Sequence, residues 1–125
     1  MKQLTLLILI IISLQLFSHE NSQSRADIFK NELQANETLM QVIEEIDNRY
    51  RIQYEKINLK IRFHNSELTE IIQTKPFQED KAKSILNKIS DAQSLLKLHN
   101  IKHHMAIEKE LDSFQRMKFN EFFSP

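Results

Sequence analysis

The 125-residue chain contains no glycine, no cysteine and no tryptophan, and only two prolines. Without cysteine it can form neither disulfides nor thiolate metal sites, and a cysteine nucleophile is excluded as well. Without glycine it lacks the residue that tight hairpins, left-handed turns and phosphate-binding loops normally require. Hydrophobic residues make up 41% and charged residues 27%, which suits one small folded domain. These absences predict an all-α protein.

The net charge is zero, with 17 basic and 17 acidic residues. A neutral chain has no overall electrostatic attraction to nucleic acid or to an anionic membrane. No serine or threonine stands in a recognisable nucleophile motif, and acidic pairs such as Glu44 and Glu45 fit a solvated helix face better than a catalytic dyad. We therefore expect no nucleic-acid partner and no enzymatic activity.

The first eighteen residues differ from the rest of the chain. Lys2 is followed by a nearly unbroken apolar run from Leu4 to Phe17, which predicts an export signal. The run is shorter than the roughly 20 residues that span a bilayer, which favours cleavage. Ser18 is a suitable small residue before a cut, but Leu16 is larger than the usual residue two places earlier, so anchoring to the inner membrane by residues 3–18 stays an alternative. The expected organisation is a signal or anchor (1–18), a flexible lead-in (19–25) and one helical domain (26–125) in the periplasm.

Two stretches of the chain have the hydrophobic period of a helix, and Pro76 lies between them. Because proline lacks an amide donor and restricts the residue before it, the first long helix should end there. A shorter helix is expected from about Arg25 to Leu33, with Asn36 near the join, and another should start at Asp112 and Ser113, which are good capping residues. The fold class predicted is a long antiparallel helical hairpin with short N- and C-terminal helices. The expected stripes are Leu39, Ile43, Ile46, Tyr50, Tyr54, Ile57, Ile61, Leu68 and Ile72, and then Ala82, Ile85, Ile89, Ala92, Leu96, His99, His103 and Ile107.

Three histidines lie close together on the second long helix. With the turn centred near Pro76, His103 should face residues near 49, close to Asp47 and Tyr50, and His99 should face residue 53. Because His99 and His103 are four residues apart, both imidazoles project from one face of the helix. Two imidazoles and a carboxylate are suitable ligands for Zn, Ni, Co or Cu. The alternative is that these histidines, like the isolated His64, are hydrogen-bonded residues of the helix interface, and that Met105 fills the core.

A short sequence motif near the C-terminus resembles a motif of a known protein family. Leu111, Asp112, Gln115 and Arg116, followed by Phe119, resemble the LTxxQ motif of the Spy/CpxP-like periplasmic proteins, in which the motif starts the last helix. Aspartate replaces threonine here and can serve equally as a helix cap. The resemblance implies a hooked helical hairpin and a homodimer.

Within that group the chain is most similar to the heavy-metal-resistance sensors of the CnrX type. An alanine-glutamine pair precedes His103 by about ten residues, as in the ligand-bearing helix of those sensors, and Asp47 falls at their carboxylate ligand. Their methionine ligand falls at Ile107, and their N-terminal histidines fall at Ala26 and Lys30. The resemblance thus implies an incomplete metal site, in which His99 or His104 would act as replacement ligands.

Two functions from different classes follow. In the first, the protein is a periplasmic heavy-metal sensor that binds a divalent transition metal through His103, His99, Asp47 and His104 and signals to a membrane anti-sigma factor. In the second, it is a stress chaperone or envelope-stress regulator that binds unfolded clients or a sensor kinase without metal. Exposed apolar and basic residues would serve the second function, such as Lys60, Arg62, Phe63 and the pair Phe122 and Phe123.

Overall fold

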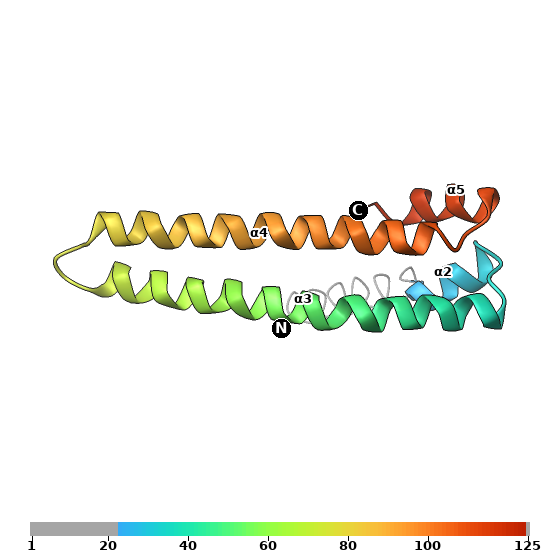
Figure 1. Cartoon of the computed structure of the whole chain (residues 1–125), viewed down its shortest axis with the longest axis horizontal. Coiled ribbons are helices and arrows are strands. Elements are labelled where there is room, and N and C mark those ends of the chain that lie inside the picture. Colours follow the sequence, from blue (N-terminus) through green and yellow to red (C-terminus); the bar gives the residue numbers. More distant parts are fainter. Residues whose placement is uncertain (1–22, 125) are drawn as a thin grey trace, which may run out of the picture.

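The computed structural model describes residues 23–124, which form four helices and no strand. The long helices are α3 (Glu37–Gln73) and α4 (Glu79–Glu108); α2 (Arg25–Asn31) precedes them and α5 (Ser113–Phe122) follows. α3 and α4 pack against each other as an antiparallel pair, and both short helices lie at the end away from the turn (Figure 1). The predicted all-α hairpin with short terminal helices is confirmed. The predicted export signal lies outside the described residues, and within residues 23–124 no helix is long and apolar enough to cross a membrane.

The helices begin and end at residues whose chemistry explains the boundaries. Asn36 caps α3, because its side-chain oxygen accepts a hydrogen bond from the Leu39 amide at 2.8 Å. α3 ends at Gln73, three residues before Pro76, as the restrictions on proline and its neighbour require. Between α2 and α3 the chain turns through Gln34, whose φ of 54° lies in the left-handed region. Glycine would favour that conformation, but the chain has none, so a glutamine adopts it.

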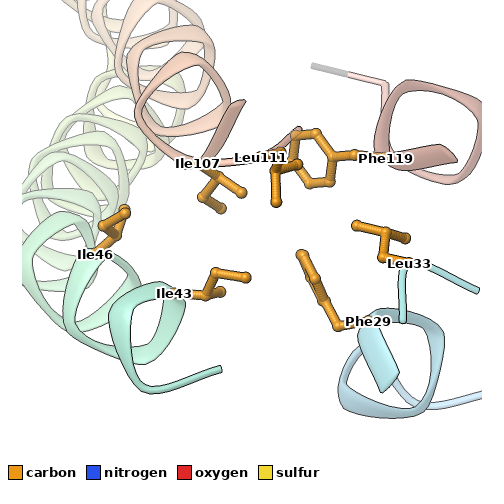
Figure 2. Close-up of a cluster of buried hydrophobic side chains, with 7 residues drawn as sticks. All are labelled: Phe29, Leu33, Ile43, Ile46, Ile107, Leu111 and Phe119. Carbon is orange, nitrogen blue, oxygen red and sulfur yellow. The ribbon is translucent and has the colours of Figure 1, made fainter. Parts of the chain in front are cut away.

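The end of the hairpin that carries α2 and α5, together with residues 37–50 and 99–108, is called the base below. All four helices or their flanking turns contribute to one apolar core there (Figure 2). Three phenylalanine rings reinforce it: the ring centroids of Phe29 and Phe119 are 5.8 Å apart, and Phe123 lies within 5.4 Å of both. The buried residues of this core, each at most 4% exposed, are Phe29, Leu33, Ile43, Ile46, Ile107, Leu111 and Phe119.

The rest of the hairpin, residues 51–73 and 79–98, is called the arm, and it consists of α3 and α4 alone (Figure 1). Only the stripe between the two helices is covered. Its buried residues are Ile57 and His64 on α3 and Ala82, Ile85, Ile89 and Ala92 on α4.

Three residues expected in the interior are exposed instead. Tyr54 and Ile72 were placed on the buried stripe of α3, but they are 42% and 55% exposed. At 100° per residue, each lies about 60° around the helix from Ile57, and with only one partner helix the covered stripe is too narrow to include them. Met105, expected in the core, is 52% exposed because it lies on the face of α4 opposite His103. His64 lies on the buried stripe, where its Nδ1 and Glu67 Oε1 are hydrogen-bonded at 2.7 Å.

Candidate functional site

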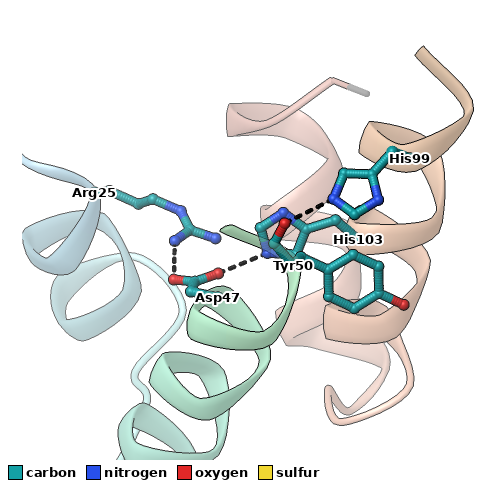
Figure 3. A network of polar contacts seen from close by, with 5 residues as sticks. All are labelled: Arg25, Asp47, Tyr50, His99 and His103. Carbon is teal, nitrogen blue, oxygen red and sulfur yellow. Dashed lines mark hydrogen bonds and ion pairs between the residues drawn. The ribbon is translucent and has the colours of Figure 1, made fainter. Parts of the chain in front are cut away.

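Asp47 joins three helices at the base of the hairpin. Its Oδ1 accepts a hydrogen bond from His103 Nε2 on α4 at 2.7 Å, and its Oδ2 accepts one from the guanidinium of Arg25 on α2 (Figure 3). The facing of His103 and Asp47, expected from the position of the turn alone, is confirmed. Their residue numbers sum to 150, close to the value that a turn centred at Pro76 gives. The carboxylate is thus paired on both oxygens.

His99 lies one turn away from His103 but has a different partner. Its Nε2 donates a hydrogen bond to the backbone carbonyl oxygen of Tyr50 at 2.8 Å. The ring of Tyr50 stacks on His103, with centroids 4.9 Å apart and planes within 8°, and it tilts against His99 at 5.1 Å. His99 was expected to face residue 53. Its observed partner, Tyr50, lies three residues earlier on α3. The two imidazoles share a helix face, as predicted, but do not converge on one point.

The electrostatics of the site favour a charged Asp47. Partial burial by itself raises the pKa of the Asp47 carboxyl, but the hydrogen bonds from His103 and Arg25 and the charge of Arg25 outweigh it and hold the pKa below its ordinary value of 3.8. The side chains of Asp47 and His103 are each 28% exposed, so solvent weakens these interactions but does not abolish them.

The expected metal shell around His103 is incomplete in this arrangement. Asp47 and His103 supply two ligand atoms, but a metal site in proteins normally takes at least three protein ligands. His99 is bonded to a carbonyl, and the guanidinium of Arg25 already lies on the carboxylate that an ion would need. Within residues 23–124 no group of three histidine, cysteine, aspartate or glutamate side chains is arranged to hold an ion. As placed, the donors form an ion-paired network in which Asp47 and His103 are the two potential ligands that lie together.

His104 points away from this network. Its Nε2 lies 2.7 Å from Asn120 Oδ1 on α5 and 3.1 Å from Glu108 Oε1, one turn further along α4. The imidazole stacks on the ring of Phe119 at 4.4 Å. His104 was proposed as a replacement ligand beside His103, and the structure places it instead in a separate cluster between α4 and α5.

The motif residues of the C-terminal phrase act on the start of α5. Asp112 accepts a hydrogen bond from the amide of Gln115 at 2.8 Å, and the Gln115 side chain accepts one from the amide of Asp112 at 3.1 Å. This reciprocal pair is a capping box formed by Asp112 and Gln115. Leu111 is buried in the core, and Arg116 Nη2 donates to its carbonyl at 3.2 Å. These residues thus fix the angle at which α5 folds back onto the base.

Two features of the structure were not found in full from the sequence, although Phe63 was expected to be exposed. Arg25 pairs with a carboxylate 22 residues away, and no local pattern marks such a partner. On the arm, Ile52, Leu59 and Phe63 are 56%, 61% and 63% exposed. Their spacing of seven and four puts them on one face of α3, about 200–240° around the helix from the buried Ile57. We call these three residues the outer stripe; the heptad spacing could have revealed it.

The chain was also compared with known proteins. No protein-family model, no curated protein and no solved structure matches it. The likeness to the Spy/CpxP-like proteins therefore stays an expectation based on the C-terminal motif and on the layout of the helices.

Proposed function

We propose that this protein is a non-enzymatic, exported stress protein that binds apolar segments of incompletely folded polypeptides along the arm of its hairpin. The observation that carries the proposal is the outer stripe, a run of three large apolar side chains on the solvent face of α3. Large apolar side chains that share one exposed helix face mark a candidate interaction site.

The surroundings of the outer stripe suit an unfolded client. Lys56 lies in line with Ile52 and Leu59, and Lys60 and Arg62 flank Phe63; all three cations are on exposed positions. Apolar side chains bind exposed hydrophobic segments, while the cations keep the surface hydrated and attract acidic stretches. Of the residues expected to contact a client, Phe63, Arg62, Lys60 and Phe122 are exposed, whereas Phe123 is partly buried against the core of the base.

A second apolar area lies beside the seam of the two long helices. Leu95 and Leu98, on α4, are 47% and 48% exposed. They line a shallow groove of about 160 Å³ with Gln53, His99 and Lys102. Apolar contacts on both helices would allow an extended client segment to lie along the arm.

The test is suppression of the aggregation of a chemically unfolded model protein, followed by light scattering. The outer-stripe variant Ile52→Gln/Leu59→Gln/Phe63→Gln keeps the helix, because glutamine is a good helix former and the positions are exposed. The matched control, Met105→Gln/Phe114→Gln/Met117→Gln, alters three apolar residues of the base that are 46–58% exposed. We expect the wild type and the control to suppress aggregation at stoichiometric ratio and the outer-stripe variant to fail.

Two results would contradict the proposal. One is equal suppression by both variants, which would place binding elsewhere. The other is that the wild type binds no client and that the outer-stripe variant differs from it only in having lost self-association, as measured by sedimentation equilibrium. The outer stripe would then be the interface of the homodimer that the family resemblance implies.

A heavy-metal sensor is the second candidate function, and the contact between His103 and Asp47 favours it. The two residues come from different helices and their polar atoms are 2.7 Å apart, as two ligands of one ion could be. The expected signal would pass to a membrane partner such as an anti-sigma factor. Calorimetric titration of the wild type and of His103→Ala with Co, Ni, Zn and Cu ions tests it. If His103 is a ligand of the sensor, a site of micromolar or tighter affinity is lost in the variant, and binding that His103→Ala leaves unchanged would contradict this second function.

A further inference from the structure

The cluster around His104 has a geometry that the functions above do not explain. Two oxygen atoms, Oδ1 of Asn120 and Oε1 of Glu108, converge on the single nitrogen Nε2 of His104 at 2.7 and 3.1 Å. A neutral imidazole nitrogen carries at most one hydrogen, so it can donate a full hydrogen bond to only one of the two. In the tautomer that carries its hydrogen on Nδ1, Nε2 and the two oxygens direct lone pairs into one small volume, and a cation satisfies that arrangement.

We propose that His104, Glu108 and Asn120 bind a divalent transition-metal ion of the zinc class, which fastens α5 onto α4. An imidazole nitrogen, a carboxylate oxygen and an amide oxygen would supply three ligands and leave a fourth position for water. Ligand bonds of about 2.1 Å in a tetrahedron separate the ligand atoms by about 3.4 Å. The observed separations of 2.7 and 3.1 Å need only a small expansion to admit the ion.

The fold holds these donors in place before any ion arrives. His104 and Glu108 are four residues apart on α4 and project from the same face of the helix. The His104 side chain is only 10% exposed, and its ring is held against Phe119 of α5. The capping box at Asp112 and Gln115 sets the direction of α5 and thereby the position of Asn120. A site whose donors are already ordered loses little conformational entropy on binding.

This site is separate from the pair formed by His103 and Asp47. The two clusters share no residue, and each histidine has its own partners on different helices. Metal binding here would stabilise the packing of α5 on the base and would need neither Arg25 to leave Asp47 nor the outer stripe. The inference therefore stands independently of the client-binding function.

The experiment is calorimetric titration of the full-length chain with Zn²⁺, repeated for three variants of the site and one control. His104→Ala removes the imidazole, Glu108→Gln removes the negative charge of the carboxylate ligand, and Asn120→Ala removes the amide oxygen. The last two variants leave the ring of His104 on Phe119 intact. His103→Ala is the control, because it removes a histidine of the same helix that belongs to the other cluster. Hydrogen exchange of the α5 amides, with and without Zn²⁺, gives a second readout on the fastening of the helix.

We expect one saturable site in the wild type and in His103→Ala, with slower exchange in α5 when Zn²⁺ is present. Glu108→Gln and Asn120→Ala should each weaken the affinity at least about tenfold, the lower end of the loss known for outer partners of a metal site. His104→Ala should abolish the saturable heat. Absence of saturable binding in the wild type would overturn the proposal, and so would binding that is lost in His103→Ala but kept in His104→Ala.

Discussion

The base and the arm of the hairpin are built from the same two helices but differ in what covers them. In the base, α2 and α5 lie against the long pair, and seven apolar residues are at most 4% exposed. In the arm, only the seam between α3 and α4 is covered, and the outer stripe is more than half exposed. The difference teaches that two helices alone can bury one stripe each, so any further apolar face is left for a partner.

The comparison is tested most strongly by removing a phenylalanine from each region. Phe119→Ala should lower the free energy of unfolding by about 3–5 kcal/mol, because the ring is 2% exposed and fills the core of the base. Phe63→Ala in the arm, at 63% exposure, should change it by no more than about 0.5 kcal/mol. Urea unfolding followed by circular dichroism measures both, and similar losses for the two variants would contradict the division into base and arm.

Removing the carboxylate that joins the three helices of the base has a smaller effect. Asp47→Asn should destabilise the fold by about 1 kcal/mol, because hydrogen bonds from Arg25 and His103 are weakened at a site about a quarter exposed. Asp91→Asn, on an exposed position of the arm, is the matched control and should be close to neutral. Equal effects in thermal unfolding would mean that the network contributes nothing to the base.

Helix caps offer a further contrast between the regions. Asp112→Ala should cost about 1 kcal/mol, because it removes the capping box of α5. Gln78→Ala should have almost no effect, because Gln78 makes no side-chain capping bond at the start of α4. Hydrogen exchange locates the change: the amides of α5 should exchange faster in Asp112→Ala, and unchanged exchange there would show that the box does not hold the helix.

The smallest expected effect is a pH dependence that belongs to the base. Because the pKa of Asp47 in the folded protein lies below its ordinary value of 3.8, its contribution to stability is present above 3.8 and is lost as the pH falls through the folded value. The unfolding free energies of the wild type and of Asp47→Asn should be compared at pH 6 and at pH 3. The difference between the two proteins should be smaller at pH 3. If the difference in unfolding free energy between the wild type and Asp47→Asn is the same at both pH values, the pKa of Asp47 does not contribute to stability in this way.

Much of the fold could be predicted from the sequence because the signals were local. The lack of glycine indicated helices, Pro76 marked the turn, and Asp112 marked the start of α5. Once the turn was known, the facing of His103 and Asp47 followed from the antiparallel arrangement. These inferences needed only the helical period and the chemistry of helix ends.

The remaining details depended on contacts that no local pattern records. Arg25 reaches Asp47 only because α2 folds back beside α3, and His104 turns to Asn120 only because α5 folds back beside α4. Tyr54 and Ile72 fit the helical period but lie at the margin of a stripe whose width depends on the number of partner helices. Gln34 adopts a left-handed conformation that its residue type does not suggest.

The most direct measurement is hydrogen exchange of the chain with and without an unfolded model polypeptide at stoichiometric ratio. If the arm is the binding surface, added polypeptide should slow exchange in residues 51–73 and 79–98, leave α2 and α5 unchanged, and have no effect in the Ile52→Gln/Leu59→Gln/Phe63→Gln variant. Slower exchange confined to α2 and α5, or no change anywhere in the chain, would contradict the proposal that the uncovered arm serves as the binding surface.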